Sequence, residues 1–259
     1  MPEKDRKLQL EAFSRLLDIM DKLREKCPWD RKQTFESLRT LTIEETYELS
    51  DAIMDNDLEE IRKELGDLLL HIVFYAKLGE EAGAFDVAAI ANGICEKLIV
   101  RHPHIYGDVK VNSEEDVKRN WEKIKLKEGK ISVLEGVPRG LSSVIKAQRI
   151  QEKAAGVGFE WDKTIDVIAK VKEEWAEFEA EITHDHKEHM EQEFGDLLFS
   201  LINLSRFLHI NPENALEQTN KKFIKRFQFI EEQARASNRT LSEMTLEEMD
   251  ELWKAAKAQ

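Results

Sequence analysis

The segments ELGDLLLHI (Glu64–Ile72) and EFGDLLFSL (Glu193–Leu201) carry the pattern that decides the fold. Each begins with two carboxylates three residues apart, separated by a pair that includes a glycine, and continues as an apolar run. Residues three apart lie on one face of an α-helix, so the two acids share a face while the apolar run needs burial. The segments are 129 residues apart in a chain of 259. They predict two similar helical units, each with acidic groups beside its core.

The rest of the chain has the same helical periodicity. Apolar residues recur at three- and four-residue steps, as in the series from Leu8 to Leu23, and alternating strand patterns with Asn-Gly or Asp-Gly turns are missing from the sequence. Glycine and proline cluster in KEGKISVLEGVPRGLSS (Lys127–Ser143). We therefore predict an all-α protein of two tandem helical-bundle domains, residues 1–126 and 141–259, joined by a linker at residues 127–140.

Composition narrows the class of protein. The 39 basic and 52 acidic residues give a net charge of −13, which argues against nucleic acid or an anionic membrane as a partner. Two cysteines, Cys27 and Cys95, indicate a reducing compartment and not a disulfide framework. The N-terminal residues lack the apolar core of a signal peptide, and the longest apolar run is too short to span a bilayer. We expect a cytoplasmic protein.

A second acidic pair precedes each opening segment, as EETYE at residues 44–48 and EEWAE at residues 173–177. In the first copy the inner acids lie eight residues on either side of Asn56, where Asp55-Asn56-Asp57 predicts a turn. In an antiparallel helical hairpin the two pairs would therefore face each other, and the second copy repeats the spacing around Thr183–His186. The predicted quartets are Glu45, Glu48, Glu64 and Asp67 in the first copy, and Glu174, Glu177, Glu193 and Asp196 in the second.

Four converging carboxylates need a cation, because like charges at short range raise one another's pKa. Oxygen-only ligands suit hard cations, and Mg²⁺ typically binds a few carboxylates together with water and substrate phosphates. Gly66 and Gly195 lie between the ligands of their helices, where a missing side chain leaves room for a hydrated ion or a nucleotide. A single ExxE is usually a solvated helix face, but a paired motif that occurs twice predicts a metal site.

At these residues the sequence resembles the MazG family of nucleoside triphosphate pyrophosphohydrolases. The family signature, ExxE followed by a spacer and ExxD, is present in both quartets, and CPWD, RHPH and GFEWD are also typical of it. The resemblance implies an all-α fold of the NTP pyrophosphatase type whose bundles are completed in a homodimer. It also implies Mg²⁺-dependent hydrolysis of a nucleoside triphosphate to the monophosphate and diphosphate. Glu174, Glu177, Glu193 and Asp196 would then be catalytic, and which glutamate acts as base is left open.

Basic and aromatic residues supply the predicted substrate contacts. A basic helix face is usually a solubility feature, but its repetition and the family resemblance favour phosphate binding. The tryptophan near the end of each unit would stack on a base or anchor its helix; the resemblance favours nucleotide binding for Trp253. The predicted substrate-binding residues are Lys170, Lys172, Lys222, Arg226 and Trp253, with Lys97, Arg101 and Trp121 in the first copy. Leu41 and Ile43 occupy the positions of the first copy that correspond to Lys170 and Lys172. Because the first copy lacks these two positive charges near its acids, we expect the C-terminal domain to be the more active.

Other functions compete with this one. A helical scaffold that only senses nucleotides would bind triphosphate without releasing diphosphate. A di-iron carboxylate bundle uses the motif Glu-x-x-His, whereas Asp67 and Asp196 stand here in the place of its histidine. The histidines of HDHKEH (His184–His189) can ligate Zn²⁺ or Ni²⁺, but they fall at a predicted turn and have no counterpart in the first copy, which favours a polar turn.

Overall fold

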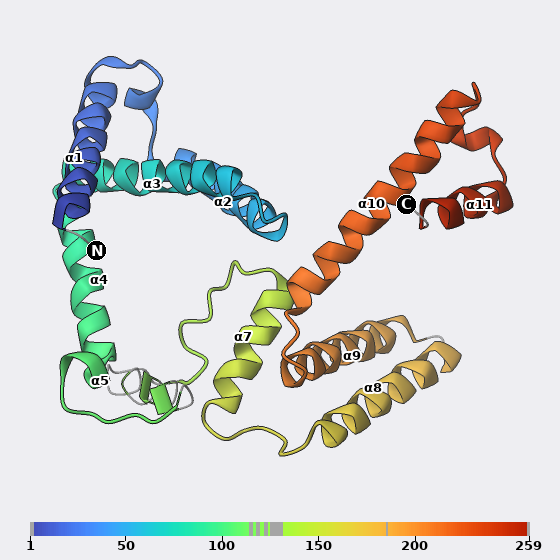
Figure 1. Cartoon of the computed structure of the whole chain (residues 1–259). Helices are drawn as coiled ribbons and strands as arrows, with labels where there is room; N and C mark the ends of the chain where they lie inside the picture. Colours follow the sequence, from blue (N-terminus) through green and yellow to red (C-terminus); the bar gives the residue numbers. More distant parts are fainter. Residues whose placement is uncertain are drawn as a thin grey trace. The chain divides into compact units, whose positions relative to one another are not determined.

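The computed structural model describes residues 3–113, 116–117, 120–121, 124, 132–184 and 186–257. Every regular element in these residues is a helix, which confirms the prediction of an all-α protein. The chain forms two compact units, Met1–Asn112 and Ser113–Gln259. Each contains a helical hairpin, α2–α3 in the first and α8–α9 in the second (Figure 1). No helix in the described part of the chain combines the length and the apolar character needed to cross a bilayer.

The first unit is built on three helices packed around a small core. Its elements are α1 (Glu3–Lys26), the 3-10 turn η1 (Asp30–Lys32), α2 (Phe35–Met54), α3 (Leu58–Glu81), α4 (Val87–Arg101) and α5 (Pro103–Tyr106). The fully buried side chains of Met20, Leu38 and Val73 come from α1, α2 and α3 respectively. These positions belong to the helical periodicity of the sequence, so the core joins all three helices.

The turn between α2 and α3 forms where the sequence predicts it. Asn56 adopts a left-handed conformation with φ of 55°, which asparagine tolerates better than most residues. The Asp57 carboxylate accepts hydrogen bonds from the backbone N–H groups of Glu59 and Glu60, at 3.0 and 3.1 Å. This cap satisfies two of the N–H groups that a helix start leaves unpaired. The short turn places α2 beside α3 along their length.

Helix α4 differs from the other long helices of the first unit. It is rich in apolar residues, yet none of its side chains is buried. Ile90, Ile94 and Leu98 recur every four residues on one face, and 37–46% of each is exposed. This unit by itself therefore leaves an apolar helix face uncovered.

The second unit begins its described helical part after the segment predicted as a linker. Its helices are α7 (Ser143–Ala155), α8 (Thr164–His184), α9 (Lys187–Phe207), α10 (Pro212–Ala236), the 3-10 turn η2 (Leu241–Glu243) and α11 (Leu246–Ala256). Helix α9 packs between α8 and α7, and α10 contacts α7 and α9 before it pairs with α11. The α8–α9 turn lies at the position that the sequence predicts.

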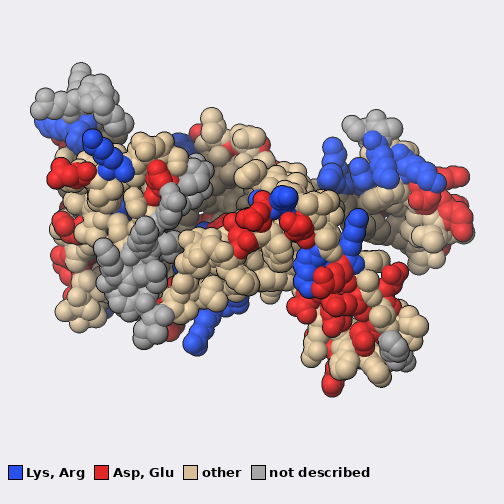
Figure 2. Space-filling model, turned by 90° about the horizontal axis from the view of Figure 1, so that it is seen from below, with Lys and Arg blue, Asp and Glu red and all other residues tan. Residues whose placement is uncertain are grey.

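The predicted linker, residues 127–140, is only partly described, because residues 127–131 lie outside the described part of the chain. Residues 132–140 belong to the second unit, as do the described residues between 113 and 126. The proposed division at residue 126 therefore stays a prediction. On the face shown in Figure 2, Asp and Glu side chains gather in dense patches, and Lys and Arg side chains lie both beside these patches and in a group of their own.

Candidate metal and nucleotide site

The α8–α9 hairpin brings acidic residues from two helices together. Carboxylate oxygens of Glu174, Glu193 and Asp196 all lie within 4.8 Å of one another. Glu174 also groups with Glu173 and Glu177 along α8 at the same distance. Three-residue spacing on each helix and the short turn between them produce this convergence. The result is a compact set of oxygen donors, with Glu174 itself buried.

The α2–α3 hairpin forms a corresponding group. Oxygens of Glu45, Glu48 and Glu64 lie within 4.8 Å of one another. Desolvation is the largest cause of the raised pKa of Glu45 and Glu64, and the nearby carboxylate of Asp67 raises the pKa of both further. Three of the four predicted acids of each quartet thus gather around one point in their own hairpin. This arrangement follows from the same spacing in both copies.

Like-charge repulsion acts in both groups. Desolvation raises the pKa of Glu193, and the nearby carboxylates of Glu177, Asp196, Glu174 and Glu181 raise it further. Mutual repulsion of this kind costs free energy unless a cation binds. One buried carboxylate oxygen of Glu64 also has no hydrogen-bond partner among the described residues. The oxygen-only donor sets of both hairpins therefore fit a hard divalent cation such as Mg²⁺.

Lys170 supplies a positive charge at the edge of the second acidic group. Its ammonium nitrogen lies 2.6 Å from Glu174 Oε1 and 2.7 Å from Glu173 Oε1. Hydrogen bonds to these two carboxylates raise the pKa of Lys170. Lys172, two residues on, is exposed. In the first copy the position of Lys170 is taken by Leu41, which packs against the core.

A cavity of about 520 Å³ opens beside the acids of α8 and α9. Lys170, Glu174 and Asp196 form part of its wall, and Trp161 contributes an aromatic ring. The remaining wall is largely apolar and comes from α7, α9 and the loops around α7, as in Ile150, Val157, Phe159 and Phe199. An apolar cavity with a few polar groups at one end is typical of a small-molecule site.

Sequence reasoning missed several residues of this cavity wall. Gln151 and Asn203 are buried in the wall, and the Gln151 amide donates a 2.8 Å hydrogen bond to the backbone oxygen of Phe199. Arg206 also lines the cavity and donates to the side-chain oxygen of Asn203 at 2.9 Å. These residues show no motif in the sequence. Asn203 and Arg206 follow Asp196 on α9, whereas Gln151 reaches the cavity because α7 packs on α9.

The predicted phosphate and base residues of α10 and α11 form a cluster of their own. The Arg226 guanidinium lies 5.4 Å from the centre of the Trp253 ring, and the Phe223 ring lies 5.0 Å from it. Lys222 is exposed one turn away on α10. The wall of the cavity beside the acids, as far as the described residues define it, does not include Lys222, Arg226 or Trp253. Their contact with a nucleotide stays a prediction.

The corresponding residues of the first copy are more scattered. Lys97 is exposed and Arg101 is half-buried at the end of α4. Trp121 lies in the second unit, next to residues outside the described part of the chain. His71, four residues after Asp67, is buried, and burial lowers its pKa. It does not belong to the group of metal-ligating atoms that Glu45, Glu48 and Glu64 form.

Comparison with known proteins identifies the family. The sequence profile of the MazG nucleotide pyrophosphohydrolase domain matches residues 33–106 and 163–228. The chain belongs to the MazG family. Each matched segment contains one quartet of acids, so the two hairpins are the two copies of this family's domain. The protein is thus an enzyme, a hydrolase that acts on phosphoric anhydrides.

Full-length relatives agree with this assignment. A nucleoside triphosphate pyrophosphohydrolase of Escherichia coli K12 is 40% identical over 96% of this MazG-family chain and 98% of its own length. A nucleoside triphosphate pyrophosphohydrolase/pyrophosphatase MazG of Thermotoga maritima is 44% identical over 95% of both chains. The crystal structure of a mazG-related protein from Thermotoga maritima covers 44% of this chain and 98% of its own, at 28% identity and a TM-score of 0.40.

Proposed function

We propose that the α8–α9 hairpin hydrolyses nucleoside triphosphates to nucleoside monophosphates and diphosphate with Mg²⁺. The observation that carries the proposal is the meeting of Glu174, Glu193 and Asp196 beside a cavity large enough for a nucleoside. Water attacks the α-phosphorus, the α–β anhydride bond breaks, and diphosphate leaves. The names of full-length relatives support this substrate class.

The residues of the chain have separate tasks in this scheme. Glu174, Glu177, Glu193 and Asp196 would hold Mg²⁺, which supplies charge neutralisation for the polyphosphate and polarises the α-phosphorus. One of these carboxylates accepts the proton of the attacking water; the desolvated Glu193, whose pKa is raised, is suited to that exchange. Lys170 and Lys172 contact phosphate oxygens from α8. Lys222, Arg226 and Trp253 bind the remaining phosphate and base surfaces.

The first copy would be the weaker enzyme. Its acids Glu45, Glu48, Glu64 and Asp67 are present, and Lys97, Arg101 and Trp121 are its expected substrate contacts. It lacks the positive charges of Lys170 and Lys172, so a triphosphate is less strongly attracted.

A homodimer is part of the proposal. The face of α4 formed by Ile90, Ile94 and Leu98 is apolar and exposed in a single chain. A second copy of the chain would bury it in a helical bundle, as the family resemblance implies. The dimer would thereby complete the packing around the first hairpin.

The test compares Glu193→Gln with Glu64→Gln in the full-length chain. Each protein is given Mg²⁺ and a panel of ribo- and deoxyribonucleoside triphosphates, and diphosphate and orthophosphate are measured separately. We expect diphosphate from the wild type and a loss of about 100-fold or more in Glu193→Gln. Glu64→Gln should lose less. Stepwise release of orthophosphate would reject the proposed bond cleavage, and triphosphate binding without turnover would favour a nucleotide-sensing scaffold.

A further inference from the structure

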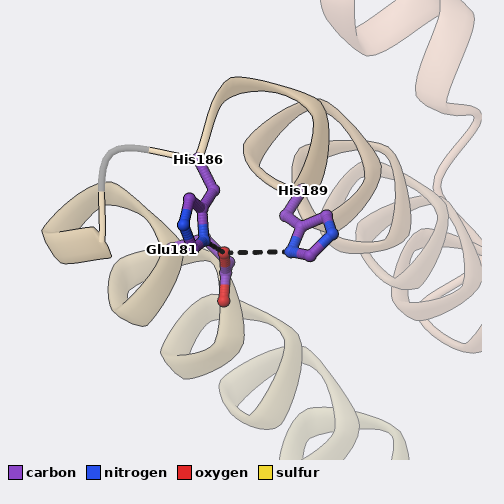
Figure 3. A group of neighbouring side chains, drawn as sticks. All are labelled: Glu181, His186 and His189. Atoms are coloured by element: carbon purple, nitrogen blue, oxygen red, sulfur yellow. Dashed lines mark ion pairs between the residues drawn. The ribbon is translucent and has the colours of Figure 1, made fainter.

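A second group of metal-ligating side chains lies at the turn of the α8–α9 hairpin. Glu181 comes from the last turns of α8, His186 precedes α9, and His189 lies in its first turn. Their ligand atoms all lie within 4.8 Å of one another. In Figure 3 the imidazole rings of both histidines, at the start of α9, face the Glu181 carboxylate on α8. The sequence favoured a polar turn here, because Glu181 lies outside the histidine segment and meets the histidines only in the folded hairpin.

The distances in this group differ from those of hydrogen bonds. His189 Nδ1 lies 3.5 Å and His186 Nδ1 lies 3.6 Å from the same oxygen, Glu181 Oε2. Hydrogen bonds between nitrogen and oxygen are usually 2.7–3.2 Å long. Two ligands of a tetrahedral zinc ion, each about 2.1 Å from the metal, lie about 3.4 Å apart. The two separations therefore match two edges of a coordination tetrahedron that meet at Glu181 Oε2.

The start of α9 gives an independent reason to expect a metal ion at this turn. His186 occupies the N-cap position of α9, yet its side chain makes no capping hydrogen bond. At the equivalent turn of the first hairpin, the Asp57 side chain caps α3 with two such bonds. The second hairpin thus gives up a helix cap, and its cap residue turns toward α8 instead. A metal ion bound by residues of both helices would link α8 to the start of α9.

We propose that Glu181, His186 and His189 form a binding site for a borderline transition-metal ion such as Zn²⁺, with its remaining position open to water. Two imidazoles and one carboxylate suit Zn²⁺, Ni²⁺ or Cu²⁺, whereas Mg²⁺ takes oxygen ligands. The site adjoins the proposed Mg²⁺ site but shares none of its ligands. Glu181 lies one helical turn beyond Glu177 and His189 one turn before Glu193. The bound ion joins the turn end of the hairpin that carries the catalytic acids.

The site can be measured without using enzyme activity. Zn²⁺ is titrated calorimetrically into the full-length protein in excess Mg²⁺, which occupies the oxygen-only groups. We expect one site per chain that weakens about 100-fold or more in His189→Ala, since even indirect changes around metal ligands cost 10–100-fold. Glu188→Gln, an exposed carboxylate on the same turn of α9, is the matched control and should bind Zn²⁺ like the wild type. Equal Zn²⁺ affinity in His189→Ala and wild type would overturn the proposal.

A second readout separates metal binding from a purely structural effect. Zn²⁺ should raise the Tm of the wild type and leave that of His189→Ala and His186→Asn unchanged. Both histidines are mostly exposed, so the variants should fold, and circular dichroism checks this. A Zn²⁺-induced rise in Tm that persists in both variants would assign the ion to other ligands, such as Cys27 or Cys95, and refute the site. These results do not depend on whether the chain hydrolyses nucleotides.

Discussion

Single residues explain how carboxylates and leucines share one short segment. Asp196 and Leu197 are neighbours in the sequence, but Asp196 is exposed beside the other acids while Leu197 is 5% exposed. Adjacent helical residues point about 100° apart, so one faces the cation site and the other the core. Lys170 offsets part of the charge of the buried Glu174. Asp196 and Glu174 thus have an exposed and a paired position respectively, despite their apolar neighbours.

Replacing Lys170 should change metal and nucleotide binding in opposite directions. In Lys170→Met the acids lose their internal cation, so Mg²⁺ should bind more tightly in the absence of nucleotide. Loss of a charged contact to phosphate should raise KM about 10-fold. Calorimetry with Mg²⁺ and steady-state kinetics measure the two effects. Lys163→Met, an exposed lysine just before α8, is the control, and parallel changes in both affinities would contradict the prediction.

Replacing Gly195 by alanine should raise stability and lower activity. A Cβ atom built at this position has nothing within 4 Å, and replacing glycine by alanine inside a helix stabilises it by about 1 kcal/mol. We expect Gly195→Ala to raise the free energy of unfolding and to lower kcat/KM, because the space between the acids is needed for ion and substrate. Urea unfolding and diphosphate release test this. Unchanged kcat/KM would show that the space is not used.

At the scale of elements, short turns and caps decide which faces meet. The α2–α3 and α8–α9 turns set the register that brings two acidic pairs together in each copy. Farther along the chain, Arg239 joins the end of α10 to α11 through two bonds to the Glu248 carboxylate, at 2.8 and 3.0 Å. This pair holds α11 in place and, with it, Trp253, whose ring packs against Phe223 and Arg226.

The Arg239–Glu248 pair gives the α10–α11 junction a defined pH dependence. Arg239, with a smaller effect from the backbone N–H of Thr245, lowers the pKa of Glu248 to about 2. A carboxylate with a depressed pKa contributes stability above its unfolded pKa of about 4.3, and the contribution is lost as the pH falls toward 2. Glu248→Gln should lower the Tm at pH 7 by roughly 1–3 °C, since the pair is exposed.

The measurement is a series of thermal melts from pH 7 to pH 3. The difference between wild type and Glu248→Gln should shrink below pH 4.3 as the wild-type carboxylate approaches protonation. Glu247→Gln removes a neighbouring exposed carboxylate without this partner and should show little change. A difference in Tm that is constant across the series would mean that ionisation of Glu248 plays no part.

At the scale of the whole molecule, one chain leaves apolar helix faces uncovered. In α9, Phe194, Leu198 and Phe199 are each more than 40% exposed, and α4 buries no side chain at all. Soluble monomers rarely expose contiguous apolar faces of this kind. Association of two chains is the simplest way to cover them.

Charge placed on the exposed face of α4 should therefore dissociate the proposed dimer. Ile94→Lys should raise the dissociation constant about 100-fold or more, because a symmetric interface loses the burial of two isoleucine side chains. Sedimentation equilibrium measures it. Glu96→Ala, on the opposite face of α4, should leave association unchanged. A wild-type chain that is monomeric at all concentrations would contradict the dimer.

The sequence alone determined the all-helical fold, the duplication and the meeting of the acids. Helical periodicity, the turn at Asp57 and the repeated ExxE and ExxD spacings are local properties, and helix geometry converts them directly into positions. The ordered similarity of the two halves also indicated two hairpins. Spacing does not distinguish a base from a metal ligand among these acids, because both roles use the same carboxylate group.

Only the tertiary structure decided what surrounds the acids. Gln151 reaches the cavity because α7 packs on α9, and Glu181 meets His186 and His189 across the hairpin turn. Trp161 lines the cavity as well. Such contacts depend on how helix faces interlock, and the free energy of that packing is spread over many side chains. Periodicity predicts which face of a helix is buried, but the packing of side chains between helices determines which residues meet there.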